Sequence, residues 1–307
     1  MAALPEHTLS LLADRARLMG AVRQFFAENG FLEVDTPIAI QAPAPEANIE
    51  AIAAPEGWGD DQARFLRTSP ELQMKRLVAA GAQQIFQIGS CFRANEVGRR
   101  HRPEFNMLEW YWAHADYRQL MQQAEMLVKH LAAAFHLPVV YQQVHLDWNS
   151  PFEILTVEDA FRKYAGVSTA DALQADNFDL LLVEKVEPHL GIGRPTFLID
   201  YPLELGALAR QSASNPEVAE RWELYIAGLE LANAFGELTD AEEQHQRFLK
   251  EQQLRQQQGC TEYPLDADFL AELHRMPPTT SGCALGLDRL LMILTNASEI
   301  NQVLLDF

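Results

Sequence analysis

Apolar residues recur every three to four positions over residues 8–29, the spacing that places them on one face of a helix. Gly30 follows this stretch, where a glycine commonly ends a helix. Further helices are predicted over residues 70–80, over residues 117–135 and over the glutamine-rich residues 241–258. A long helix is therefore expected to open the chain.

Shorter runs of apolar and aromatic residues, bounded by Pro, Gly or polar side chains, predict strands. FLEVDTP, residues 31–37, is such a run, and the Ala-, Pro- and Glu-rich residues 41–61 that follow predict a loop. Strands are also expected over residues 84–88, over the aromatic-rich residues 105–112 and over TFLID, residues 196–200.

Two polar segments complete the pattern. Residues 90–104 are rich in Arg and lie between two predicted strands, which suits a functional loop, and residues 156–190 have a charged, helical pattern that predicts a helical insertion. Strands scattered among helices without a regular βαβ order favour the α+β class. We expect a mostly antiparallel sheet flanked by helices.

Length and composition fit a soluble enzyme, since 307 residues with 48% hydrophobic content can bury a large core. The first residues carry charges where a signal peptide needs an apolar run, and no segment is apolar for long enough to span a membrane. A cytoplasmic protein is expected. The three cysteines are far apart, which suggests neither a disulfide framework nor a CxxC metal site.

The formal charge of −19 opposes broad attachment to a nucleic acid backbone. The basic group at Arg99, Arg100, His101 and Arg102 is the exception. It can serve as a local nucleic-acid patch or as a grip for the phosphates of a small molecule.

The segment WELYIAGLELANAF predicts a hairpin that turns at residues 227–228. A two-residue loop puts Tyr225 opposite Glu230, and alternation then places Glu223 and Glu230 on one face. Two carboxylates on one face repel each other unless a cation lies between them, and oxygen ligands favour Mg²⁺ bridging phosphates. The alternative is a solvated acidic face, which the apolar flanks argue against.

The segment SGCALGLDRLLMIL combines an extended, glycine-spaced stretch with an apolar helix. Gly282 and Gly286 would let a flat ligand approach the backbone. Arg289, near the start of the helix, can grip a phosphate or stack on a base. A simple turn with a helix cap at Asp288 explains the same residues.

A third candidate lies in SCFRANEVGRRHRPEFNMLEWYW. Alternation places Phe105, Met107, Glu109 and Tyr111 on one face of a strand, opposite a basic loop that begins at Arg93. An aromatic ring, a carboxylate and a phenol are unusual together in a core, although each alone can be a satisfied core residue.

These segments resemble a known family. FLEVDTP is similar to motif 1, FRANEVGRRHRPEF to motif 2 and GLDRL to motif 3 of class II aminoacyl-tRNA synthetases, and TSPELQMKRL, PEFNMLEWYWAHADY and GLELANAFGELTDAEEQ resemble the lysyl branch. A lysyl-tRNA synthetase carries an N-terminal OB-fold domain that reads the anticodon, whereas motif 1 begins here within the first forty residues. We therefore expect a single catalytic domain, residues 1–307, without that OB domain and without anticodon recognition. This architecture resembles the truncated paralogues that attach β-lysine to a lysine of elongation factor P.

The resemblance implies ATP and Mg²⁺ as cofactors, with Arg93 and Arg289 as catalytic residues. It implies metal binding by Glu223 and Glu230. The ATP-binding residues it implies are Arg93, Asn95, Glu96, His101, Phe105, Glu223, Gly286 and Arg289. The residues it implies for the amino-acid substrate are Ser69, Glu71, Glu109, Tyr111, Asn233, Glu237 and Ala284.

Two positions depart from the family pattern. Asn95 stands where motif 2 usually has a Glu that reads the adenine amino group, and Glu96 follows it. Ala284 stands where lysyl-tRNA synthetases have Gly, and an alanine there is associated in the truncated paralogues with a preference for β-lysine over α-lysine. A methyl group on the pocket floor would displace a substrate amino group by steric contact.

The expected function is ATP-dependent activation of lysine or (R)-β-lysine as an adenylate, followed by transfer to a lysine ε-amine of elongation factor P. One alternative keeps the adenylate chemistry with another acceptor, tRNA or a small amine. A second is a non-catalytic synthetase paralogue that acts as a regulatory binding module. Because class II cores usually dimerise through the motif 1 helix and strand, a homodimer is expected.

Overall fold

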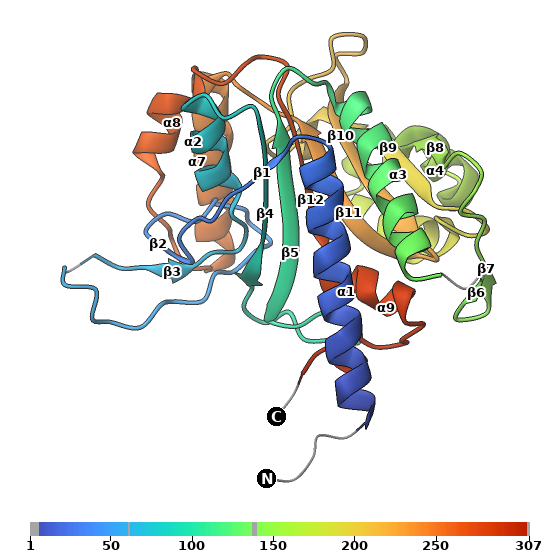
Figure 1. The fold of residues 1–307 in the computed structure, drawn as a ribbon. Helices are drawn as coiled ribbons and strands as arrows, with labels where there is room; N and C mark the ends of the chain where they lie inside the picture. The colour runs from blue at the N-terminus through green and yellow to red at the C-terminus, as the bar shows by residue number, and fades with distance from the viewer. Residues whose placement is uncertain (1–5, 61, 137–139, 306–307) are drawn as a thin grey trace.

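The computed structural model describes residues 6–60, 62–136 and 140–305, and within them a mixed eight-stranded sheet forms the centre of the molecule (Figure 1). The two outermost pairs, β1 with β4 and β8 with β9, are parallel, and the five inner pairs are antiparallel. The α+β class with a mostly antiparallel sheet is therefore confirmed. In spatial order the strands are β1 (Leu32–Glu33), β4 (Gln84–Phe92), β5 (Glu104–Trp112), β12 (Ser281–Gly286), β11 (Leu229–Gly236), β10 (Val218–Ile226), β9 (Thr196–Pro202) and β8 (Glu153–Thr156).

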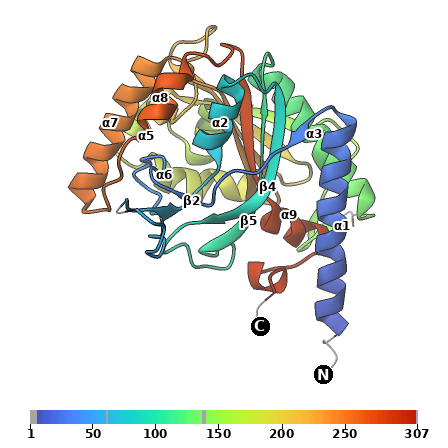
Figure 2. The ribbon, with the colours of Figure 1, turned by 60° about the vertical axis from the view of Figure 1, so that its left-hand side comes forward.

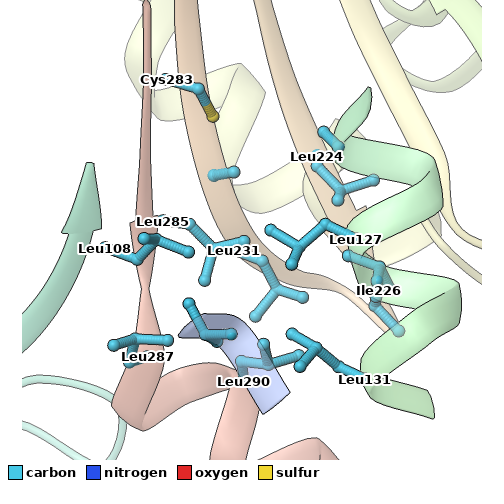
Figure 3. Packing of buried hydrophobic residues seen from close by; sticks show 14 of the residues in the cluster. Leu108, Leu127, Leu131, Leu224, Ile226, Leu231, Cys283, Leu285, Leu287 and Leu290 are labelled. Carbon is cyan, nitrogen blue, oxygen red and sulfur yellow. The ribbon is translucent and has the colours of Figure 1, made fainter. Parts of the chain in front are cut away.

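Three helices cover one face of this sheet: α1 (Glu6–Glu28), α3 (Tyr117–Ala134) and α9 (Leu287–Leu294). Asp116 caps α3 by accepting hydrogen bonds from the backbone of Arg118 and Gln119. Alternation along the strands sends one set of apolar side chains to this side, where they pack between sheet and helices. Figure 3 shows this packing for Leu108, Leu127, Leu131, Leu224, Ile226, Leu231, Cys283, Leu285, Leu287 and Leu290.

A second group of helices, α2 (Glu71–Ala79), α7 (Ala241–Gln258) and α8 (Ala267–Leu273), packs together with its own apolar core. Figure 2 shows these three helices on the opposite side of β4 and β5 from α1. The predicted site residues lie on the part of this second face that α2, α7 and α8 leave uncovered.

The predicted helical insertion is helical, but it is broken into short pieces that pack on β9. Gly166, with a positive φ of 75°, ends one of them. The helical prediction is confirmed, and the interpretation of the segment as an insertion stays a prediction. The pieces are α4 (Val157–Ala160), η1 (Phe161–Ala165), α5 (Thr169–Gln174), α6 (Phe178–Leu181), η2 (Leu182–Val186) and η3 (Glu187–His189).

Some predicted boundaries were wrong. The run at residues 31–37 pairs as a strand only at β1, and beyond it the Thr36 hydroxyl donates a hydrogen bond to the buried Gln87. Strand β4 continues to Phe92, which shortens the Arg-rich loop to residues 93–103. The predicted loop at residues 41–61 is mostly irregular, and its last residue, like residues 1–5 at the chain start, lies outside the described residues.

The remaining elements are small. Two short antiparallel pairs lie outside the main sheet, and none of the helices in the described ranges is long and apolar enough to cross a membrane. The small elements are β2 (Ala39–Ile40), β3 (Phe65–Leu66), β6 (Val140–Tyr141), β7 (Val144–His145), η4 (Leu203–Leu205) and η5 (Ile300–Gln302).

Candidate active site

A pocket opens on the sheet face opposite α1 and α3, over β5, β12 and β11. It is closed on its sides by the loop after β4, the start of α2 and the start of α9. Most of the predicted site residues come together in it: Ser69, Glu71, Arg93, Glu96, His101, Phe105, Glu109, Tyr111, Glu230, Asn233, Glu237, Ala284, Gly286 and Arg289.

A one-residue bulge in β11 decides which of these side chains face the pocket. Tyr225 pairs with Glu230 as predicted, but Leu224 then pairs with Ala232, so Leu231 is the extra residue. Strict alternation would put Glu230 and Asn233 on opposite faces, because they are three residues apart. The bulge returns Asn233 to the pocket face.

The floor of the pocket is strand β12, whose pocket-facing positions carry almost no side chain. A Cβ added to Gly282 would lie 2.3 Å from the Tyr111 ring and 2.5 Å from Oε1 of Glu237, so a larger residue does not fit there. At Gly286 the nearest atoms to such a Cβ belong to Arg289, 3.8 Å away. This end of the floor leaves room for a flat ligand to lie against the backbone.

One end of the pocket is acidic and buried. The Glu109 carboxylate is 1% exposed and accepts hydrogen bonds of 2.7 Å from both the Ser69 hydroxyl and the Tyr111 hydroxyl. Burial, followed by the charge of Glu71, raises the pKa of Glu109 to about 7. A carboxylate held in this way favours a cationic partner.

Glu71 and Glu237 complete the acidic end. The Lys75 ammonium lies between them, 2.5 Å from Oε1 of Glu71 and 2.6 Å from Oε2 of Glu237. Burial raises the pKa of Glu237 to about 8, although Lys75 opposes the rise. In the described part of the chain, Oε1 of Glu237 has no hydrogen-bond partner. An unmet buried acceptor of this kind is suited to an amino-group donor.

The other end of the pocket is basic and more open. The Arg93 guanidinium lies 5.2 Å from the centre of the Phe105 ring, and Nη2 of Arg289 lies 2.5 Å from Nε2 of His101. Burial, followed by the charge of Arg289, lowers the pKa of His101. These groups can bind a polyanion whose flat ring stacks on Phe105.

Asp288 fixes the start of α9 at this end. Its carboxylate accepts hydrogen bonds from Arg15 on α1 at 2.8 Å and from the backbone of Asn106 on β5 at 2.7 Å. The side chain is 2% exposed. Asp288 therefore anchors the start of α9 and positions the neighbouring Arg289. The helix cap considered in the sequence analysis accounts for only part of this role.

Glu223 and Glu230 are the metal ligands predicted from the sequence. Within the described residues, no group of three or more His, Cys, Asp or Glu side chains is arranged to hold a metal ion. The two carboxylates nevertheless influence each other, because burial, followed by the charge of Glu223, raises the pKa of Glu230. Mg²⁺ is commonly bound by one or two carboxylates and completed by phosphates and water. Glu230, which lines the pocket, fits this pattern, whereas both oxygens of Glu223 already accept hydrogen bonds from Arg221 and Tyr201.

Two predicted residues lie outside the pocket lining. Glu223 sits behind Glu230, where its carboxylate accepts hydrogen bonds from Arg221 and Tyr201, each at 2.6 Å. Asn95 is exposed, with a positive φ of 65°. That backbone turn leaves the next residue, Glu96, as the one that lines the pocket.

Several lining residues were missed from the sequence. Glu46 and Ile49 come from the loop at residues 41–61, which the buried Arg255 of α7 holds by donating to both of their carbonyl oxygens, at 2.8 and 2.7 Å. Burial, followed by the charge of Glu71, raises the pKa of Glu46 to about 7. A buried arginine within a glutamine-rich helix gives no sequence signal that would have revealed this link.

Comparison of the sequence with known proteins identifies the family. The family described as "tRNA synthetases class II (D, K and N)" matches residues 3–305. The chain belongs to this family, which confirms the resemblance drawn from the three motifs.

The individual relatives carry two names. The chain is 38% identical over 311 residues to elongation factor P–(R)-β-lysine ligase of Hamiltonella defensa, which covers 98% of this chain and 95% of that protein. It is 37% identical over 310 residues to the protein of that name from Proteus mirabilis, with the same coverage. It is 36% identical over 320 residues to lysine–tRNA ligase of Thiobacillus denitrificans, and there the match covers 96% of this chain but spans only 63% of the relative's length.

Proposed function

We propose that this protein is an ATP-dependent, AMP-forming ligase that activates lysine or (R)-β-lysine as an adenylate and transfers it to a lysine ε-amine of elongation factor P. The observation that carries the proposal is the buried acidic end, with Glu71, Glu109 and Glu237 around one small space. Glu109 and Glu237 are each 1% exposed and the Glu71 side chain 13%, and three carboxylates so shielded from water suit a substrate with more than one ammonium group.

In this proposal the substrate lies along β12 with its carboxylate toward Arg93. Glu71, at the start of α2, would receive its backbone amino group. Glu109 and Glu237, assisted by Tyr111 and Asn233, would surround its side-chain ammonium. The Ser69 hydroxyl donates to Glu109 and accepts from the Glu71 backbone at 3.0 Å. It would thereby fix the positions of these two residues relative to each other.

ATP would occupy the basic end, with adenine on Phe105 above Gly286 and the phosphates between Arg93, His101 and Arg289. Glu96, which lines the pocket, is better placed than the exposed Asn95 to accept a hydrogen bond from the adenine amino group.

Glu230, backed by Glu223, would hold Mg²⁺, which would supply charge neutralisation at the phosphates. Arg93 and Arg289 would bind the α-phosphate and the outer phosphates and would stabilise the charge that develops during adenylate formation. Positioning of the two substrates accounts for the rest, so a covalent enzyme intermediate is not required.

The identity of the acceptor rests on two supports. Relatives that align with this chain over 95% of their length carry the name elongation factor P–(R)-β-lysine ligase. Ala284, between Asn233 and Glu109 in the sheet register, supplies the methyl group that the resemblance associates with β-lysine. The second candidate is transfer to tRNA, favoured by the equally similar lysine–tRNA ligases.

We also propose that the protein acts as a cytoplasmic homodimer through α1 and β1. The large apolar side chains exposed on and beside these elements are the support, because patches of this kind mark interfaces. Sedimentation at working concentration should give twice the chain mass, and a monomer would contradict the proposal. The exposed residues are Leu9, Leu12, Leu32 and Ile38.

The activity is tested in two stages. Pyrophosphate exchange is measured with α-lysine and with both β-lysine enantiomers, and transfer of the labelled amino acid is then measured to elongation factor P and to tRNA. Exchange with (R)-β-lysine and transfer to the protein acceptor are expected. Faster transfer to tRNA would support the second candidate, and no exchange with any lysine would contradict both.

A further inference from the structure

Lys75 is a buried ammonium group beside the pocket, in contact with two of the carboxylates that line it. It lies one helical turn after Glu71 on α2, and its side chain is 0% exposed. Its contacts, 2.5 Å to Glu71 and 2.6 Å to Glu237, join helix α2 to the residue that follows β11. Lys75 itself has no direct contact with the substrates in the proposed reaction.

The charge of Lys75 is fixed by its partners. Burial alone would disfavour the ammonium form, but the charges of Glu237 and Glu71 together raise the pKa of Lys75 above its ordinary value. Lys75 is therefore a permanent cation at any physiological pH. It cannot serve as the base that deprotonates the acceptor amine.

This cation changes the charge balance of the acidic end. Three carboxylates lie around it, those of Glu71, Glu109 and Glu237, and Lys75 neutralises one negative charge. Glu46, which also lines the pocket and whose pKa burial and the charge of Glu71 raise, adds a fourth carboxylate. Negative charge therefore remains for the ammonium groups of a diamino acid. Oε1 of Glu237, buried and unpartnered among the described residues, is one point where such an ammonium can bind.

We propose that Lys75 is a positioning and specificity-determining residue for the diamino-acid substrate, an inference that rests on the proposed function. It holds the Glu71 and Glu237 carboxylates in place and neutralises part of the negative charge at the acidic end, which leaves the rest for the ammonium groups of the substrate. Without it, the three carboxylates repel one another and take up protons at neutral pH, so they attract the substrate less.

The test compares Lys75→Met with Lys129→Met. Lys129 makes the same type of pair, 2.7 Å to a glutamate four residues earlier, but on the outer helix α3. Calorimetry with L-lysine and with 1,5-diaminopentane measures binding without catalysis. Lys75→Met should weaken both ligands by about ten- to a hundredfold, the range for a lost charged hydrogen bond, while Lys129→Met stays within about twofold.

A purely structural defect is excluded by two further readouts. In Lys75→Met, lysine binding should reach half its maximum at a higher pH than in the wild type. ATP binding should be unchanged. If Lys75→Met does not fold, Lys75→Met/Glu237→Gln removes both charges of the buried pair and is compared with Glu237→Gln alone. Lysine binding by the double variant should be weaker again, because Glu71 has lost its anchor.

The outcomes separate the two proposals. Unchanged lysine affinity and unchanged pH dependence in folded Lys75→Met, or a double variant equal to Glu237→Gln, would overturn the role of Lys75 and leave the proposed function standing. Wild-type protein that binds neither lysine nor 1,5-diaminopentane would overturn the proposed function, and this inference with it.

Discussion

The two ends of the pocket are built on opposite principles. At the acidic end the ionised side chains are closed off from water, with Lys75 at 0% and Glu237 at 1% exposure, and they hold one another in place. At the basic end Arg93 and Arg289 remain 24% and 22% exposed. The acidic end suits a small ligand that must be recognised group by group, and the open end suits a larger polyanion that enters and leaves.

Because of this difference, substitutions at the two ends should affect different steps of the reaction. A substitution at the basic end should affect the rate of adenylate formation, because the arginines meet charge that develops in the reaction. A substitution at the acidic end should affect substrate binding, because its groups contact a part of the substrate that does not react.

The largest effect is expected at the basic end, for Arg93→Ala. Loss of a guanidinium at the α-phosphate should lower the maximal rate of pyrophosphate exchange by about 10²–10³-fold, the range found when one preorganised donor is removed. The matched control is Arg99→Ala, since Arg99 belongs to the same basic loop but is 75% exposed and pairs with Glu299. Equal losses in the two variants would contradict the division between the ends.

A smaller effect, and one of another kind, is expected at the acidic end for Glu109→Gln. The amide keeps the shape, but it lacks the charge, and its single oxygen accepts only one of the two hydrogen bonds that Ser69 and Tyr111 donate to the carboxylate. The KM for lysine should rise about ten- to a hundredfold, with the KM for ATP unchanged. Steady-state exchange kinetics measure both, and a rise in the KM for ATP would show that the two ends are not independent.

The resemblance predicted residues at both ends of the pocket, and the two of them that do not line it, Asn95 and Glu223, were expected to bind ATP or metal. Arg93, Phe105 and Arg289 occur in family motifs, and their positions follow from a strand, a loop and the start of a helix. The hairpin turn was also predictable, since Ala227 and Gly228 both adopt positive φ, as a tight two-residue turn requires.

The acidic end depends on features that local pattern does not encode. Period-two alternation cannot foresee the extra residue Leu231, which places Asn233 and, farther on, Glu237 toward the pocket. Lys75 was missed because a lysine in an amphipathic helix usually reaches water. Its burial follows from the packing of α2 against the sheet, which joins residues more than 160 positions apart.

The affinity for lysine, which binds at the acidic end, should depend on pH, whereas the affinity for ATP should not. The pKa values of Glu109 and Glu237, raised to about 7 and about 8, mean that these carboxyls take up protons as the pH falls through this range. An ammonium ligand needs them ionised, so the affinity for lysine should rise with pH across it and then level off. Calorimetry over this range should show no parallel rise for ATP.

Lysine affinity that stays constant or falls as the pH rises from 7 to 8 would refute this prediction, and a constant affinity would show that the free enzyme already holds these carboxyls ionised. Glu109→Gln is the informative variant here, because it removes the group with the lower pKa and should leave one transition, that of Glu237, at a lower pH than before, since, besides burial, the charge of Glu109 helps to raise the pKa of Glu237.

The smallest effect is expected on the pocket floor, where the two ends meet. Ala284 lies between Asn233 of β11 and Glu109 of β5, so its methyl group points to the region where the amino groups of α- and β-lysine differ. Ala284→Gly should shift the ratio of kcat/KM values toward α-lysine by roughly 1 kcal/mol, about fivefold, at the low end of the range for one methyl group. The ratio of the two substrates is its own control, since general damage lowers both values equally. A variant that lost activity with its ratio unchanged would assign the methyl group to packing, and discrimination between the isomers would then belong to the carboxylates that Lys75 holds.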